Sequence, residues 1–218
     1  MMLPKLVIFD MDGTVLNTLE DLLAAMNHAL TKRGMPPHTL KEMQSFVGNG
    51  LYMMAVRAVP EGTSKEDVDA VFRDFKAYYS EHLNVYTKPY DGIREVLAAL
   101  KERGIATAIS SNKYDAGAKL LAQCHFGALV DMTVGESELT PKKPDPAGTL
   151  AIMRALGGTP ENTMYFGDSG VDIETAKNAG LTCVCVSWGF RSPEQLLEAG
   201  AETVVTGPAE MLSYILER

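Results

Sequence analysis

The chain has 218 residues, of which 46% are hydrophobic and 22% charged, so its composition is that of an ordinary folded protein, not a disordered or fibrous one. Its 20 basic and 28 acidic residues give a net charge of −8, and there is no run of Lys or Arg. This balance argues against nucleic acid or a membrane surface as the main partner, while a small anionic substrate needs only a local cationic pocket. No segment resembles a secretory signal or a membrane span, so we expect a cytoplasmic protein, as a monomer or a homodimer.

The first predicted strand is followed by a long helical interval. Residues 5–10 (KLVIFD) have the apolar, β-branched character of a buried strand. From there to about Lys88 we find only helical periodicity, in residues 19–34, 40–48, 51–59 and 64–83. This interval predicts an inserted helical domain over residues 16–87, with linkers near Val15–Thr18 and Tyr86–Tyr90.

Beyond the insert, strands and helices alternate. The apolar runs typical of strands are residues 105–111, 129–135, 163–168, 183–188 and 201–207. Helical periodicity separates them in residues 92–104, 115–127, 146–158 and 171–180. Such alternation predicts a doubly wound parallel α/β sheet, a Rossmann-like core built from residues 1–15 and 88–218.

Polar side chains follow the apolar runs in a repeated way. Asp10 ends the first predicted strand, Ser111 the second and Asp168 the fourth, while Lys143 lies in the loop after the third. In open α/β sheets, ligands bind in the crevice beyond the carboxyl ends of the strands. We therefore expect these four residues to converge on one edge of the sheet.

Two carboxylate clusters favour a metal at that edge. Asp10 and Asp12 are one residue apart and must repel each other unless a cation lies between them, although Asp12-Gly13 could also form the turn of a hairpin. Asp168 and Asp172 can both face the strand ends if a helix begins near Gly170, although Asp168 could instead cap that helix. Hard oxygen ligands of this kind are those that Mg²⁺ prefers, so we expect Mg²⁺ as the cofactor.

A lysine and two hydrogen-bonding residues complete the candidate site. Lys143 lies between prolines that stiffen the backbone, where it could pair with Asp10 and neutralise a phosphoryl group, or could simply be solvated, the interpretation we prefer for Lys142. Ser111 and Asn112 could donate hydrogen bonds to phosphoryl oxygens, or could cap the following helix.

Taken in order, these motifs resemble a known family. DMDGT, the Ser at the end of the second strand, KPDP and GDSGVD are similar to the four motifs of the haloacid dehalogenase superfamily of phosphohydrolases, over essentially the whole chain. The helical insert is similar to that superfamily's small cap domains. Residues 46–59 (FVGNGLYMMAVRAV) and 186–205 (VSWGFRSPEQLLEAGAETVV) are most similar to bacterial phosphoglycolate phosphatases.

The resemblance implies a Mg²⁺-dependent phosphatase acting on a small phosphorylated metabolite through an aspartyl-phosphate, with 2-phosphoglycolate, hydrolysed to glycolate and phosphate, as the first expected substrate. Asp10 would be the nucleophile and Asp12 the general acid and base. Mg²⁺ would be held by the Asp10 carboxylate, the Asp12 backbone carbonyl and Asp168. Lys143 and Ser111 would hold the phosphoryl group, and Asp172 would orient a metal-bound water or Lys143.

In the insert, Gly48 and Asn49 precede a helix whose N–H groups could bind a carboxylate of the substrate, or they could form a flexible linker. We assign no role to Arg57. A sugar-phosphate mutase or a pyrophosphatase on the same framework stays an alternative. The order of the motifs argues against a non-catalytic phosphoacceptor of the response-regulator type, in which the acceptor Asp follows a middle strand.

Overall fold

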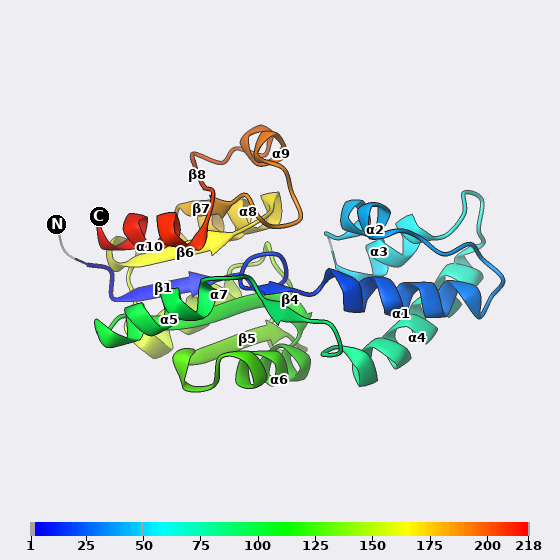
Figure 1. The fold of residues 1–218 in the computed structure, drawn as a ribbon, viewed down its shortest axis with the longest axis horizontal. Helices are drawn as coiled ribbons and strands as arrows, with labels where there is room; N and C mark the ends of the chain where they lie inside the picture. The colour runs from blue at the N-terminus through cyan, green and yellow to red at the C-terminus, as the bar shows by residue number, and fades with distance from the viewer. Residues whose placement is uncertain (1–2, 49, 218) are drawn as a thin grey trace. The chain divides into compact units, whose positions relative to one another are not determined.

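The structure is a computed structural model that describes residues 3–48 and 50–217, and contacts between Cα atoms divide it into two units. One unit runs up to Leu16 and resumes at Pro89, and the other is Asn17–Lys88. Where the chain passes between the units, Leu16–Asn17 (β2) and Lys88–Pro89 (β3) form a two-stranded sheet. Figure 1 shows the elements of both units in chain order.

The first unit contains a six-stranded parallel sheet in the order β5-β4-β1-β6-β7-β8. Its strands are β1 Leu6–Phe9, β4 Ala106–Tyr114, β5 Met132–Glu136, β6 Thr163–Gly167, β7 Cys183–Val186 and β8 Thr203–Val205. Every residue of β1, β6 and β7 is buried, which is why these strands have continuous apolar runs without polar alternation.

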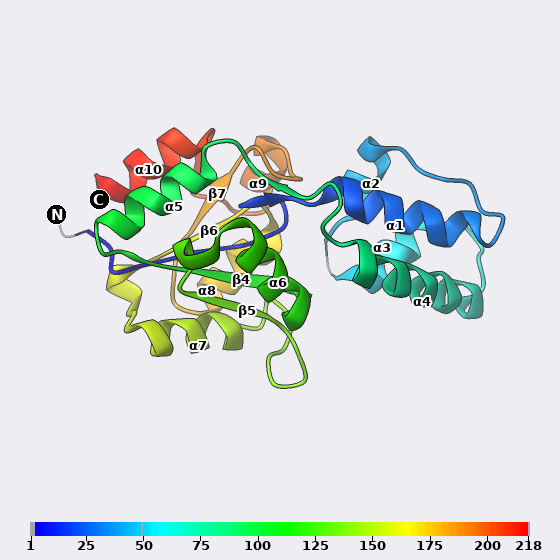
Figure 2. The same ribbon diagram turned by 60° about the horizontal axis from the view of Figure 1, so that its bottom comes forward.

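Helices cover both faces of this sheet, which confirms the predicted doubly wound α/β fold. They are α5 Ile93–Glu102, α6 Asp115–His125, α7 Ala147–Leu156, α8 Gly170–Asn178, α9 Pro193–Glu198 and α10 Pro208–Leu216. Figure 2 shows α5 and α10, which pack on each other, on one face of the sheet, and α7 and α8 on the other. We did not predict α9 or α10, although Ser192 and Gln195 form a capping box at the start of α9, a signal visible in the sequence.

Two local predictions need correction. Because β4 and β6 occupy the two edges of β1, both in parallel, the Asp12-Gly13 turn does not form a hairpin with β1. Ser111 does not end its strand either, since β4 continues to Tyr114 after an irregularity in its pairing with β5. Gly135 explains how β4 can continue so close to β5: a Cβ there would lie 2.5 Å from the Lys113 carbonyl oxygen.

The second unit is helical. It consists of α1 Leu19–Thr31, α2 Leu40–Phe46, α3 Leu51–Ala58 and α4 Lys65–His82. Helices α1 and α4 pack together, and their fully buried side chains include Met26, Leu30 and Phe75. None of the helices in the described part of the chain is long and apolar enough to cross a membrane.

A buried carboxylate links the last residues of the helical unit to its first helix, α1, by hydrogen bonds. Asp21, in the first turn of α1, is 2% exposed. It accepts hydrogen bonds from the backbone N–H groups of Val85, Tyr86 and Thr87 and from the Thr87 hydroxyl, at 2.7 to 3.2 Å. Charge-assisted bonds of this kind are stronger than neutral ones. Asp21 therefore fixes the segment just before β3.

We expect Asp21→Asn to lower the free energy of unfolding by about 2–4 kcal/mol, because Asp21 Oδ2 accepts from the buried Thr87 N–H and hydroxyl. An amide has one acceptor oxygen where the carboxylate has two, and its NH₂ group would face N–H and O–H donors. Urea unfolding followed by circular dichroism measures this. Glu20→Gln, one residue earlier on the exposed side of α1, is the matched control and should change the value by less than about 0.5 kcal/mol. Equal effects of the two variants would contradict the role given to Asp21.

Candidate active site

The site lies where the strand order reverses. β1 lies between β4 and β6. After β1 the chain forms β4 and β5 on one side of it, and then β6, β7 and β8 on the other side. Ligands of doubly wound sheets bind at this point, beyond the carboxyl ends of the strands. Asp10 directly follows β1, Asp168 directly follows β6, and Ser111 lies on β4.

Lys143 is the centre of a buried ionic network. Its side chain is 7% exposed, and its Nζ lies 2.6 Å from Asp10 Oδ1 and 2.7 Å from Asp172 Oδ1. It also donates to the Ser110 carbonyl at 3.1 Å. Burial alone would lower the pKa of Lys143, but the Asp10 and Asp172 carboxylates outweigh burial and raise this pKa, so the lysine is a fixed cation. The alternative of a solvated Lys143 is wrong.

Asn112 contacts the backbone of Lys143 through both ends of its amide. Asn112 Oδ1 accepts from the Lys143 N–H at 2.6 Å, and Asn112 Nδ2 donates to the Lys143 carbonyl at 3.1 Å. The structure thus gives Asn112 a contact that we did not predict: it fixes the loop that carries Lys143. Ser111 also makes a local contact, since its hydroxyl oxygen accepts from the Lys113 N–H at 3.1 Å.

Three carboxylates meet beside Lys143. Oxygen atoms of Asp10, Asp168 and Asp172 all lie within 4.8 Å of one another, and all three residues are buried. Burial raises the pKa of Asp10 well above its usual value; Asp172, Asp168 and Asp12 raise it further, while Lys143 opposes them. Burial and the Asp172 charge also raise the pKa of Asp168, to about 7. One lysine among three carboxylates leaves negative charge uncompensated, so this oxygen donor set fits Mg²⁺.

The loop after β7 holds Asp168. Asp168 Oδ2 accepts a hydrogen bond from the Phe190 N–H at 2.6 Å. Asp168 does not cap α8, whose first flanking residue is Ser169. A Cβ at Gly13 would lie 2.2 Å from Asp168 Oδ2, and one at Gly189 would lie 2.4 Å from it. Two glycines therefore allow the backbone to close around this carboxylate.

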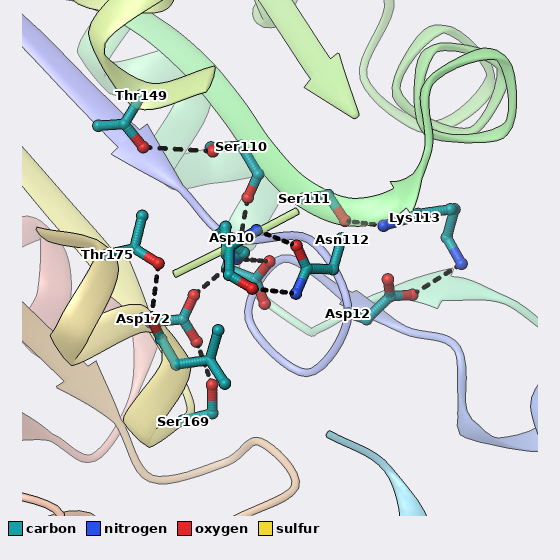
Figure 3. A network of polar contacts seen from close by, with 12 residues as sticks. Asp10, Asp12, Ser110, Ser111, Asn112, Lys113, Thr149, Ser169, Asp172 and Thr175 are labelled. Atoms are coloured by element: carbon teal, nitrogen blue, oxygen red, sulfur yellow. Dashed lines mark hydrogen bonds and ion pairs between the residues drawn. The ribbon is translucent and has the colours of Figure 1, made fainter. Parts of the chain in front are cut away.

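Asp172 and Asp12 have different surroundings. Asp172 lies in the first turn of α8, where its Oδ2 also accepts from the Ser169 hydroxyl at 2.6 Å. Asp12 pairs instead with Lys113, a residue that our sequence reasoning missed, at 3.1 Å between Asp12 Oδ1 and Lys113 Nζ. Figure 3 shows the Asp12–Lys113 pair on the side of Asp10 away from Asp172. Asp10 and Asp12 thus pair with different lysines, Lys143 and Lys113.

The residues predicted in the helical unit are only partly described. Asn49 lies outside the described residues. Gly48 lies between α2 and α3, and its carbonyl accepts from Arg57 Nη1 at 3.0 Å. The same nitrogen donates to the Phe46 carbonyl at 2.8 Å, so Arg57 fixes the backbone that precedes α3.

Comparisons with known proteins agree with the resemblance carried by the motifs. A family model described as haloacid dehalogenase-like hydrolase matches residues 7–186. Phosphoglycolate phosphatase of Pseudomonas putida is 36% identical over 197 residues, which cover 86% of this chain and 71% of that protein. N-acetylmuramic acid 6-phosphate phosphatase of Pseudomonas aeruginosa is 31% identical over 213 residues, which cover 97% of this chain and 94% of that protein. A crystal structure from Lactobacillus delbrueckii subsp. bulgaricus, named as a proposed phosphoglycolate phosphatase, has a TM-score of 0.93 and 30% identity and covers 98% of this chain and 99% of its own.

Proposed function

Because this chain belongs to the haloacid dehalogenase-like hydrolase family, we propose that it is a Mg²⁺-dependent phosphatase that hydrolyses small phosphomonoesters through an aspartyl-phosphate on Asp10. The observation that carries the proposal is the buried Asp10 carboxylate, 2.6 Å from Lys143 and grouped with Asp168 and Asp172. A nucleophile, a fixed cation and an oxygen donor set for a metal are the parts that phosphoryl transfer requires.

The Asp10 and Asp168 carboxylates are the proposed metal ligands, together with the Asp12 backbone carbonyl as the family resemblance implies. When bound, Mg²⁺ would cancel the repulsion between Asp10 and an anionic phosphoryl group and stabilise the charge on the transferred group. Asp172 shares Lys143 with Asp10 and would keep the lysine directed at the reacting atoms.

The chain's own residues account for the two proposed steps. The Asp10 carboxylate attacks phosphorus and the ester P–O bond breaks, while Asp12 gives a proton to the leaving oxygen. Asp12 then takes a proton from the water that attacks the phosphoryl group, which releases phosphate and restores Asp10. Lys143 stays protonated throughout and stabilises the negative charge on the phosphoryl oxygens, with Ser111 as a further proposed donor.

For the substrate, we propose 2-phosphoglycolate first, since the relatives with this activity in their names are 31–36% identical over most of the chain. The Pseudomonas aeruginosa relative is nearly as similar, so N-acetylmuramic acid 6-phosphate belongs in the same test. Phosphate release from these two esters, β-glucose 1-phosphate and pyrophosphate, with and without Mg²⁺, tests the proposal.

Mg²⁺-dependent release from one ester well above the others supports the phosphatase and identifies its substrate. A mutase would instead return the phosphoryl group from Asp10 to a sugar phosphate, so isomerised β-glucose 1-phosphate without steady phosphate release would favour that alternative. Preference for pyrophosphate as the substrate would favour the second alternative, a pyrophosphatase. If no ester is hydrolysed under any metal condition, the proposed function is wrong.

Mg²⁺ affinity should fall as the pH falls. A carboxyl group must lose its proton to bind the metal, and Asp168, with a pKa of about 7, is increasingly protonated below that value. Proton competition at this one group predicts an apparent affinity about tenfold weaker for each pH unit below ~7. Calorimetry in two buffers of different ionisation enthalpy measures both the affinity and the protons released. An affinity that is constant across this range would contradict the assignment of Asp168 as a ligand.

A further inference from the structure

A second buried lysine, Lys113, pairs with Asp12, and the proposed reaction gives it no task. The Lys113 side chain is 2% exposed, less than the 7% of Lys143, and it pairs at 3.1 Å with Asp12, whose side chain is 21% exposed. An ion pair with a buried lysine is weak evidence for stability, because removing the ammonium group from water opposes its attraction to the carboxylate. Stability alone therefore does not explain the Lys113–Asp12 pair.

The backbone around Lys113 fixes its direction. Its N–H donates to the Ser111 hydroxyl, and its carbonyl lies against Gly135, where a Cβ would be only 2.5 Å away. The irregular pairing of β4 with β5 spans residues 110–114, so Lys113 lies in the part of the strand that departs from regular register. A side chain anchored on a sheet strand in this way can hold a partner more closely than a loop residue can.

We propose that Lys113 is a positioning residue that holds the Asp12 carboxyl group toward the oxygen of the leaving alcohol. The proposal rests on the function proposed above. Proton transfer needs the acid within hydrogen-bond reach of the leaving oxygen, and an ordered side chain meets this condition more often than a mobile one. Asp12 follows the central strand by three residues and is only partly buried, so a fixed partner such as Lys113 restricts its orientation.

The position of the pair agrees with this role. In Figure 3, Lys113 and Asp12 lie on one side of Asp10 and Asp172 on the other. Lys143 joins Asp10 to Asp172 on that second side. The two lysines thus have separate partners: Lys143 contacts the attacking carboxylate, and Lys113 contacts the carboxylate proposed to serve the leaving group.

Leaving-group dependence separates positioning from a merely structural role. The p-nitrophenolate ion departs without a proton, whereas an alkoxide needs one, and kcat/KM reports the steps up to departure of the leaving group. For Lys113→Met, we expect kcat/KM to fall about 100-fold with ethyl phosphate and 2-phosphoglycolate but less than about threefold with p-nitrophenyl phosphate. Lys113→Arg, which keeps the charge, should recover part of the loss. Lys119→Met, which breaks an exposed Lys–Asp pair on α6, is the matched control.

Each outcome decides the proposal. Equal losses with all three esters would show a structural role and overturn it, and a loss confined to 2-phosphoglycolate and to KM would show that Lys113 binds the substrate carboxylate instead. In the Asp12→Ala background, Lys113→Met should add little, because the group that it positions is gone. If the native chain itself hydrolyses none of the esters, the proposed function fails and the role of Lys113 fails with it; losses seen only in the Lys113 variants concern the role of Lys113 alone. Retained hydrolysis of p-nitrophenyl phosphate shows that the variant is folded.

Discussion

Asp10→Asn should lower kcat/KM for every phosphomonoester by at least about 10⁴-fold, because an amide cannot act as the nucleophile. The fold should survive this change. The Asp10 carboxyl is buried beside Asp168 and Asp172, and its raised pKa shows that its charge is unfavourable there, so a neutral group of the same size relieves repulsion. Initial rates of phosphate release over a range of substrate concentrations measure the effect.

Two controls make this result interpretable. Thermal unfolding should show that Asp10→Asn melts no lower than the native chain. Asp145→Asn, an exposed carboxylate in the loop that carries Lys143, should keep native kinetics. A fully active Asp10→Asn would mean that the nucleophile is another group, and the reading of DMDGT would be wrong.

Lys143→Met should lower kcat/KM by about 10²–10³-fold, the usual effect of removing one preorganised group that stabilises transition-state charge. It should also lower the free energy of unfolding by about 3–5 kcal/mol in the absence of metal, because Asp10 and Asp172 lose their shared cation while buried. Since Mg²⁺ would supply positive charge to Asp10, one of these two carboxylates, added metal should restore part of this stability. Phosphate release and urea unfolding, each with and without Mg²⁺, measure these effects.

The neighbouring lysine provides the matched control. Lys142 is exposed, so Lys142→Met should change stability by less than about 0.5 kcal/mol and leave the kinetics unchanged. Lys143→Arg should not restore activity fully, because a planar guanidinium does not replace a compact ammonium group in a buried site. Native activity in Lys143→Met would contradict the assignment of this residue as the fixed cation.

The sequence was sufficient for the features that depend on local pattern. Continuous apolar runs predicted the buried strands β1, β6 and β7, and strand-end chemistry predicted that Asp10, Lys143 and Asp168 share one edge of the sheet. The parallel alternation of strands and helices makes this possible, because the carboxyl ends of parallel strands meet at one edge.

The remaining features depend on long-range contacts. Lys113 resembles any charged residue near a strand end until the irregular register of β4 places it beside Asp12, about a hundred residues earlier. The Phe190 group that holds Asp168 is a backbone N–H in the loop after β7, so no side-chain type in the sequence marks this contact. The position of Asn112 after an apolar run predicts a phosphoryl donor, but its amide is hydrogen-bonded to the backbone of Lys143.

The central claim is that Asp10 carries the phosphoryl group between the two steps. The most direct measurement is acid quenching within a turnover, followed by peptide mass spectrometry, with p-nitrophenyl phosphate and Mg²⁺, for native protein and Asp12→Ala. We predict a phosphoryl group on Asp10 in both, more of it in Asp12→Ala because the base that activates water is missing, and none in Asp10→Asn. Steady phosphate release by the native chain, with Asp10 unmodified at every time point in both proteins, would contradict the account.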